Sequence, residues 1–200
     1  MPEVDDMTPV PGAAPEPGDP RGRSLASRYG WVVGALAAAA ALAWGIRTFV
    51  AMPYYVPTGS MLDTIHEGDL LIGEKASLAW RPPEQGDVVT FVSPLDGETL
   101  IKRVIAVGGQ TVDLRDGAVY VDGEPLDEPY TLGKPSYSLS ELSGSAGIAY
   151  PYTVPEGSVW VMGDNRTNSR DSRYFGPVSV DDVTSRAAFI YWPPQNIGLL

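Results

Sequence analysis

A serine and a lysine stand where the sequence could bring them together as a nucleophile and its base. Ser60 follows Gly59 in a short turn that reads Pro-Thr-Gly-Ser from residue 57. The glycine tolerates unusual backbone angles and leaves room for a second backbone to approach. A serine hydroxyl becomes a good nucleophile when a nearby group takes its proton. The turn is therefore a candidate nucleophile site; the alternative is an ordinary structural serine after glycine.

Lys102 is the candidate base, because the chain contains no cysteine and a single histidine. In an extended segment, Leu100, Lys102 and Val104 share one face, which is otherwise apolar. Burial lowers the pKa of a lysine, so the neutral amine can accept a serine proton near neutral pH. The alternative is a lysine that protects a sheet edge from aggregation. The single histidine, His66, lies in a polar turn and is predicted to be an exposed loop residue.

A polar stretch at residues 162–174 could supply the groups that hold such a pair in place. Asp171 and Arg173 are two residues apart and can form an ion pair that fixes a turn, and Ser169 offers a hydroxyl beside them. Supporting hydrogen bonds of this kind give a catalytic side chain its direction. The glutamate and the spacing of an EF-hand loop are absent, so these acids predict no calcium site.

The composition excludes several classes of function. Hydrophobic residues make up 44% of the chain and charged residues 20%, which is ordinary for a globular protein with a core. The net charge of −11 argues against a nucleic-acid partner. The absence of cysteine excludes disulfides, cysteine-ligated zinc and a thiol nucleophile.

The elements that would position the candidate residues begin with an N-terminal anchor. Residues 1–28, rich in proline and acids at their start, are predicted to be a disordered cytoplasmic tail. Residues 29–50 are predicted to be a transmembrane anchor, since they carry no charge from Tyr29 to Ile46. Arginines at positions 21, 23 and 28 precede the anchor, so the N-terminus is expected in the cytoplasm. A buried core helix and a cleaved signal peptide are the alternatives.

The remainder of the chain, residues 51–200, has the pattern of an antiparallel β domain. Tight turns of the hairpin type are marked by Asp-Gly pairs at residues 116–117 and 122–123. We expect a mainly β fold with an antiparallel sheet or partly closed barrel, a smaller inserted β or loop region at about 123–157, and one transmembrane helix in front. The expected strands are 70–74, 88–92, 100–107, 111–115, 118–121, 158–162 and 187–192.

Several segments together resemble the type I signal peptidases, also called leader peptidases, a family of membrane-anchored Ser/Lys serine proteases. Residues 57–61 (Pro-Thr-Gly-Ser-Met) look like the family's nucleophile box, and residues 68–75 are similar to its next box. Residues 102–105 (Lys-Arg-Val-Ile) look like the box of the base. Residues 163–176, which open with Gly-Asp-Asn-Arg and close with Tyr-Phe-Gly, match the last box. The resemblance spans roughly residues 30–192.

The resemblance implies a role for each matching residue. By this likeness the serine and lysine act through an acyl-enzyme, the Thr58 hydroxyl and the Ser60 N–H form the oxyanion hole, and Ser169 orients the lysine amine. The matching residues are Ser60 and Lys102 as the catalytic pair; Thr58, Ser169, Asp171 and Arg173 as oxyanion and supporting residues; and Val56, Pro57, Met61, Ile65, Leu100 and Ile101 as substrate-binding residues.

The resemblance also implies a substrate and a place in the cell. The chain is expected to remove N-terminal signal peptides from exported preproteins after small residues in an Ala-x-Ala pattern. Its partners would be preproteins and membrane lipid, with no nucleic acid, metal or cofactor. It is expected to cross the bacterial plasma membrane once, with its catalytic domain on the extracytoplasmic face. The alternatives are a catalytically inactive, membrane-tethered β domain that binds a partner, and a self-cleaving regulatory protease, which would normally carry a DNA-binding domain.

The chain departs from the family pattern at three places. Asp63 stands where family members usually carry proline, and Gly73 stands where a β-branched residue is common. Residues 106–110 replace a commoner Gly-x-Pro-Gly-Asp turn. None of these changes falls on a residue expected to take part in the chemistry.

Overall fold

A computed structural model describes residues 25–143 and 147–200 of the chain. The first described element is helix α1 (Leu25–Phe49), and its stretch Tyr29–Arg47 is long and apolar enough to cross a membrane. Alanine and leucine, both good helix formers, fill its centre. The helix begins before residue 29, the predicted start of the anchor. The predicted tail lies outside the described residues as far as residue 24.

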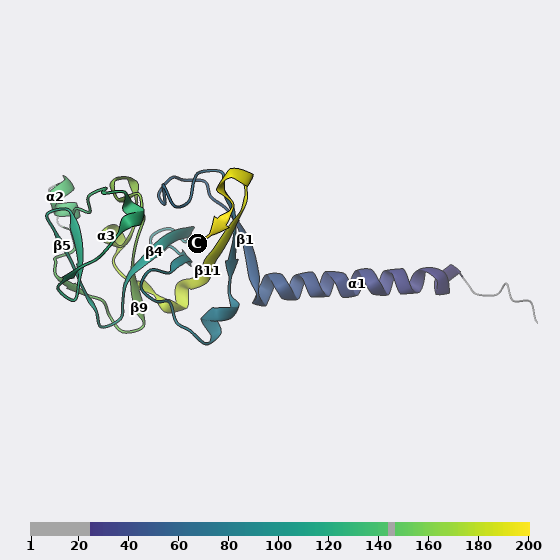
Figure 1. Ribbon diagram of the computed structural model, residues 1–200. Coiled ribbons are helices and arrows are strands. Elements are labelled where there is room, and N and C mark those ends of the chain that lie inside the picture. Colours follow the sequence, from purple (N-terminus) through teal and green to yellow (C-terminus); the bar gives the residue numbers. More distant parts are fainter. Residues whose placement is uncertain (1–24, 144–146) are drawn as a thin grey trace, which may run out of the picture. The chain divides into compact units, whose positions relative to one another are not determined.

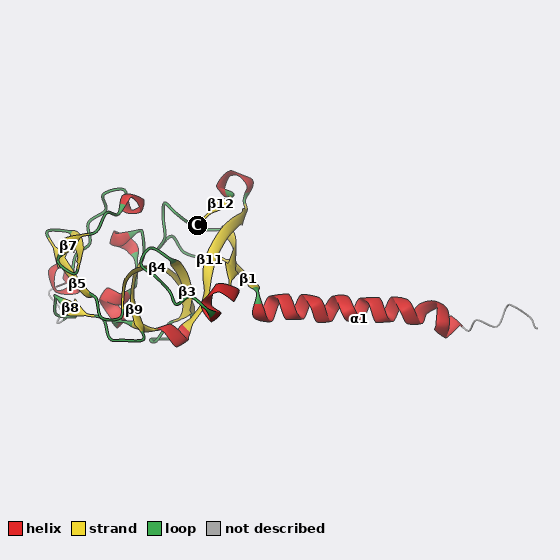
Figure 2. Cartoon of the chain, turned by 60° about the horizontal axis from the view of Figure 1, so that its bottom comes forward, coloured by secondary structure: helices red, strands yellow, loops and turns green. Residues whose placement is uncertain are grey.

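The unit that spans residues 43–200 contains two antiparallel sheets. The larger sheet runs in the order β1-β2-β11-β3-β4-β9-β10, with β12 paired to β11, and it curls into a half-barrel (Figures 1 and 2). This is the mainly β, partly closed architecture that the sequence predicts. The strands of this sheet are β1 (Ala51–Tyr55), β2 (Leu70–Glu74), β3 (Val88–Val92), β4 (Thr99–Val107), β9 (Ser158–Met162), β10 (Val178–Ser179), β11 (Val183–Trp192) and β12 (Gly198–Leu199).

The smaller sheet runs in the order β7-β6-β5-β8, and only β7 and β8 come from the inserted region expected at about 123–157. Asp116 and Gly117 join β5 to β6, and their φ angles of 50° and 79° are those of a two-residue hairpin turn with both residues left-handed. The strands are β5 (Thr111–Arg115), β6 (Ala118–Val121), β7 (Glu124–Pro125) and β8 (Tyr152–Thr153). Short helices complete the unit: α2 (Leu139–Ser143), α3 (Ser172–Phe175) and the 3-10 turns η1 (Ala76–Ala79), η2 (Pro129–Thr131), η3 (Arg166–Asn168), η4 (Val180–Asp182) and η5 (Pro194–Asn196).

Most of the expected strands have the expected bounds, whereas the two-residue strands β7, β8, β10 and β12 are not among them. Strands β2, β3, β5, β6 and β9 have the predicted bounds, and β4 begins one residue early. The sequence does not predict β1, because Pro53 lies inside it. Proline is tolerated there because β1 is the last strand of the sheet and pairs, among the described strands, with β2 alone. Strand β11 begins at Val183, ahead of its predicted start, since its polar first half hides the pattern.

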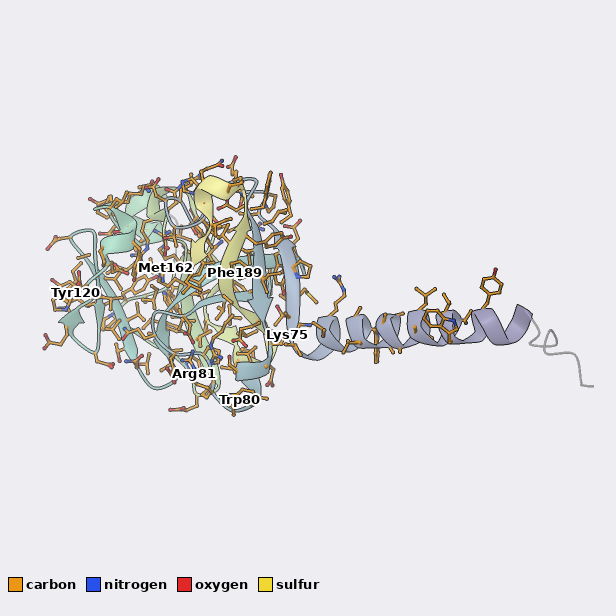
Figure 3. The ribbon with its side chains drawn as sticks, turned by 45° about the vertical axis from the view of Figure 1, so that its right-hand side comes forward. Lys75, Trp80, Arg81, Tyr120, Met162 and Phe189 are labelled. Atoms are coloured by element: carbon orange, nitrogen blue, oxygen red, sulfur yellow. The ribbon has the colours of Figure 1, made fainter. Side chains whose placement is uncertain are left out.

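The core of the unit lies between the curled sheet and the segments that cover it. Met162 of β9 is fully buried and lies within the unit in Figure 3, whereas Trp80 lies at the edge and is 76% exposed.

Strand β4 lies inside the larger sheet but is only partly paired on one side. It pairs with β3 from Thr99 onward but with β9 only from Arg103 onward, so its first residues keep a free edge among the described strands.

Candidate active site

Ser60 and Lys102 meet where the turn after β1 passes the first half of β4. Lys102 Nζ lies 2.7 Å from Ser60 Oγ, and it also donates to the carbonyl oxygen of Ile101 at 2.7 Å. Lys102 is 2% exposed, whereas Ser60 is half-buried and opens on a cleft. The two atoms are therefore placed for direct proton transfer.

The pKa of Lys102 is lowered to about 8, and the main cause is burial, which disfavours the charged ammonium. The negative charges of Asp171 and Asp164 oppose this shift, and the positive charge of Arg170 adds to it. A lysine with this pKa is partly neutral in mildly alkaline solution. Only the neutral amine has a lone pair to accept the Ser60 proton.

A cleft runs from Ser60 and Lys102 along the end of β1 and the start of β4. Thr58, Ser60 and Lys102 all line it, and the described residues give the exposed Thr58 hydroxyl no hydrogen-bond partner. Four of the expected substrate-binding residues, Val56, Pro57, Leu100 and Ile101, also line it. The other two, Met61 and Ile65, do not: both are fully buried in the core cluster behind it.

Asn165 holds the nucleophile turn through two hydrogen bonds. Its Nδ2 donates to the carbonyl oxygen of Gly59 at 2.8 Å, and its backbone N–H donates to the carbonyl oxygen of Ser60 at 3.1 Å. Gly163 packs against the same turn, since a Cβ built there would lie 2.4 Å from the Ser60 carbonyl oxygen and 2.2 Å from Ser169 Oγ. The sequence pattern indicates this segment as a box but singles out neither residue, because these contacts join positions about a hundred residues apart.

Ser169 lies at the site without a hydrogen bond to Lys102. Its Oγ is buried and has no hydrogen-bond partner among the described residues. It packs against Gly163, while the Lys102 amine is bonded to Ser60 and Ile101. The orienting role expected for Ser169 stays a prediction.

The ion pair between Asp171 and Arg173 is formed and buried. Asp171 accepts from Nε and Nη2 of Arg173, each at 2.9 Å, and also from the backbone N–H of Gly163 at 3.1 Å. Arg173 Nη2 donates in addition to the Arg166 carbonyl oxygen at 2.8 Å. Bidentate arginine–carboxylate pairs of this kind fix geometry strongly. The pair closes the loop that carries Gly163 and Ser169.

A second ion pair connects β4 to the segment after the nucleophile. Arg103 donates to both carboxylate oxygens of Asp164, at 2.9 and 2.6 Å, and Thr64 Oγ1 donates to the same carboxylate at 2.5 Å. The Arg103 guanidinium also lies 4.0 Å from the centre of the Tyr130 ring, which comes from the inserted region. These contacts tie together β4, the loop after β9 and the chain beyond Ser60.

Two departures from the family pattern are explained by their neighbours. A Cβ built on Gly73 would lie 2.1 Å from Ser185 Oγ and 2.7 Å from Tyr54 Cε2, so these side chains fill the space of a larger residue. Asp63 lies 3.3 Å from Lys134 Nζ, which also donates to the Leu62 carbonyl oxygen at 3.3 Å. The acid after the nucleophile is therefore matched by a lysine of the inserted region.

Among the described residues, His66 is bonded to Asp69 rather than to Ser60 or Lys102. The backbone N–H of His66 donates to Asp69 at 2.8 Å, its side chain is 46% exposed, and it has no hydrogen bond to Ser60. The described residues hold no group of three or more histidine, aspartate or glutamate side chains that could bind a metal ion.

Comparisons with known proteins agree on one family. Residues 18–192 match the family described as "Signal peptidase, peptidase S26". The chain is 42% identical over 173 residues to a probable signal peptidase I-1 from Synechocystis sp., covering 82% of this chain and 83% of that one. It is 40% identical over 167 residues to signal peptidase I from Leptolyngbya laminosa, covering 80% and 77%. A solved structure of a signal peptidase I from Enterococcus faecalis is 34% identical and covers 53% of this chain and 97% of that one, with a TM-score of 0.42.

Proposed function

Because the chain belongs to the signal peptidase S26 family, we propose that it cleaves signal peptides from preproteins with Ser60 as nucleophile and Lys102 as base. The observation that carries the choice of these residues is the 2.7 Å contact between Lys102 Nζ and Ser60 Oγ, made by a lysine that is 2% exposed. A buried lysine with a lowered pKa can serve as a general base where an exposed one would stay charged.

In the first half of the reaction, neutral Lys102 takes the proton of Ser60 as Oγ attacks the scissile carbonyl carbon. The carbonyl oxygen becomes negatively charged and is held by the Ser60 backbone N–H and the Thr58 hydroxyl. A single donor of this kind typically contributes a factor of ~10²–10³ in rate. The Lys102 ammonium then gives its proton to the leaving nitrogen as the C–N bond breaks.

In the second half, the acyl group remains as an ester on Ser60. Neutral Lys102 takes a proton from a water molecule, whose oxygen attacks the ester carbon. The Ser60 oxygen leaves and recovers the proton from Lys102, so the enzyme returns to its starting state. The signal peptide is released with a free carboxylate, and the mature protein with a free amine.

The substrate is proposed to lie extended along two free strand edges. Strand β1 ends the sheet, and β4 lacks a second partner before Arg103 among the described strands. A peptide laid beside them would gain main-chain hydrogen bonds, as in other cases of strand addition. In an extended peptide the first and third residues before the cleaved bond face the same way. Both would enter a cleft backed by the filled core around Met61, which favours small side chains and an Ala-x-Ala pattern.

The chain is further proposed to act at a membrane, anchored by α1. The support is the apolar stretch Tyr29–Arg47 and the arginines that precede it at positions 21, 23 and 28. This arrangement would place residues 1–28 in the cytoplasm and residues 51–200 on the extracytoplasmic face of a bacterial plasma membrane.

The test is cleavage of a purified preprotein carrying an Ala-x-Ala site by the full chain in detergent. Wild type, Ser60→Ala and Lys102→Met would be compared, and the new N-terminus of the product sequenced. Cleavage at the expected junction by wild type alone is the expected result. Cleavage by the Ser60→Ala variant would exclude this nucleophile. No cleavage by folded wild type would favour the tethered binding domain.

A further inference from the structure

We propose that Asn165 is a positioning residue for the oxyanion hole, whose side-chain amide sets the orientation of the Ser60 N–H. This inference rests on the proposed function, because the Ser60 N–H matters only if Ser60 is the nucleophile. It concerns a residue that touches neither the substrate nor the reacting atoms. Its effect would pass through one peptide plane.

The Gly59 carbonyl and the Ser60 N–H belong to the same peptide unit. That unit is planar, with its C=O and N–H pointing in opposite directions. The Asn165 amide donates to the Gly59 oxygen at 2.8 Å, so the Ser60 N–H of the same plane is directed away from Asn165. Fixing the carbonyl therefore fixes the direction of the proposed oxyanion donor.

Without the Asn165 bond, the orientation of this peptide plane would be weakly fixed, because the residue that precedes it is a glycine. Glycine permits a wide range of backbone angles, so the peptide that follows Gly59 is free to rotate unless something grips it. Within the described residues, the one other donor to the Gly59 oxygen is the Leu62 N–H, at a longer 3.3 Å. The side chain of Asn165 thus makes the shorter of the two bonds.

The backbone of Asn165 also forms a hydrogen bond to the next peptide plane. Its N–H donates to the Ser60 carbonyl oxygen at 3.1 Å, so the peptides on both sides of Ser60 are bonded to one residue. That residue is 8% exposed and stands between two ion-paired neighbours, Asp164 with Arg103 and Arg166 with Glu128. Both hydrogen bonds are therefore made by a residue that is shielded from water.

The experiment replaces the amide and asks which ligands lose affinity. Asn165→Leu removes the bond to Gly59 but keeps the backbone bond to Ser60. The control is Gln85→Leu, which removes another side-chain amide bond to a main-chain oxygen, from Gln85 Nε2 to Ile105 at 2.9 Å, at an exposed residue on a cleft that Ser60 does not line. Both variants would be prepared as the full chain in detergent and their melting temperatures measured.

Two ligands separate an oxyanion effect from general binding. One is a substrate-like peptide aldehyde, to whose carbonyl carbon Ser60 Oγ adds while Lys102 takes the hydroxyl proton, leaving the aldehyde oxygen as an oxyanion. The other is the matching peptide alcohol, which binds without forming an oxyanion. We expect Asn165→Leu to bind the aldehyde ~10–100-fold more weakly and the alcohol unchanged, since a small misplacement can lose up to ~10²-fold. Its kcat should fall by a similar factor at constant KM.

Several results would overturn the proposal. One is equal affinity of Asn165→Leu and wild type for the aldehyde, and another is equal loss for aldehyde and alcohol. Asn165→Ala is the second variant in case leucine does not fit, and failure of both to fold would assign the amide a purely structural role. If wild type itself neither cleaves preprotein nor distinguishes aldehyde from alcohol, it is the proposed function that fails.

Discussion

The proposed role of Lys102 as the base predicts that cleavage depends on pH. The pKa of this lysine is lowered to about 8 by burial, and only its neutral form can take the Ser60 proton. Between pH 7 and pH 9 the neutral fraction rises from about a tenth to about nine tenths, so kcat/KM should rise about tenfold. Steady-state cleavage of a neutral peptide across this range measures the effect. A flat profile would exclude Lys102 as the base.

The charge of Lys102 should lower the free energy of unfolding at neutral pH. The pKa of Lys102 is about 8 in the folded chain and ~10.4 when unfolded, so between these values the unfolded state binds more protons and stability rises with pH. Below pH 8 both states are protonated, and the folded state bears the whole penalty of a buried ammonium, about 3 kcal/mol.

Lys102→Met should therefore be inactive yet more stable than wild type at pH 7, because methionine fills a similar volume without a charge. The gain should shrink as the pH approaches 10.5, where wild-type lysine is neutral in the folded state and about half neutral in the unfolded state. Denaturant unfolding of both chains at pH 7 and pH 10.5 measures this difference. A stability difference between the two chains that is the same at both pH values would show that folding does not lower the pKa of Lys102.

At the scale of elements, the loop after β9 is built around the close approach of Gly163 to the nucleophile turn. A Cβ at this position would lie 2.4 Å from the carbonyl oxygen of Ser60 and 2.2 Å from Ser169 Oγ. The Ser60 backbone lies on one side of an added Cβ and the buried Ser169 side chain on the other, so neither neighbour can easily move away. Gly163→Ala should displace the turn, lower kcat at least ~10²-fold and destabilise the chain by about 1–3 kcal/mol.

The control for this prediction is Gly198→Ala, where the nearest atom to an added Cβ is 3.9 Å away. That variant should keep the activity and the melting temperature of wild type. Cleavage rates and thermal unfolding of both variants provide the comparison. An active, stable Gly163→Ala chain would mean that the loop can move away from Ser60 at little expense.

The sequence predicts elements well where one periodic pattern decides them. Strands β2 and β3 have the expected bounds because runs of apolar and β-branched residues end at turns. The pattern fails at β1, because proline at position 53 disfavours a strand and is permitted there only by the edge position. It also fails at the start of β11, where the polar residues before Ala187, among them the buried Arg186, hide the strand pattern. Lys102 could be singled out because a charge on an apolar face is a local signal. Asn165 could not be singled out, because only the folded chain brings it next to its partner Gly59.

At the scale of the whole β unit, the inserted region is tied to the active site through a buried arginine. Arg166 is fully buried, pairs with both carboxylate oxygens of Glu128, and donates to Ser136 Oγ at 2.6 Å. Its Nε donates to the carbonyl oxygen of Gly163 at 3.0 Å, beside the nucleophile turn. A single guanidinium thus joins the segment before α2 to the loop that holds Ser60.

Breaking this pair should affect both stability and catalysis. Glu128→Gln leaves the charge of Arg166 buried without its partner, and the loss expected for a broken buried pair is about 3–5 kcal/mol. The exposed pair of Arg81 and Glu84 is the control, because Glu84→Gln should leave the stability nearly unchanged. Denaturant unfolding of the two variants gives the comparison.

The double variant Glu128→Leu with Arg166→Met separates charge from packing. It removes both charges together, so the cost of an unpaired buried charge disappears and most of the stability lost in Glu128→Gln should return. Its kcat should stay below that of wild type, because methionine cannot donate to the Gly163 carbonyl as Arg166 does. Recovery of stability together with full activity would show that the inserted region supports the fold without positioning Ser60. Recovery of neither would mean that Arg166 acts mainly by the space it fills.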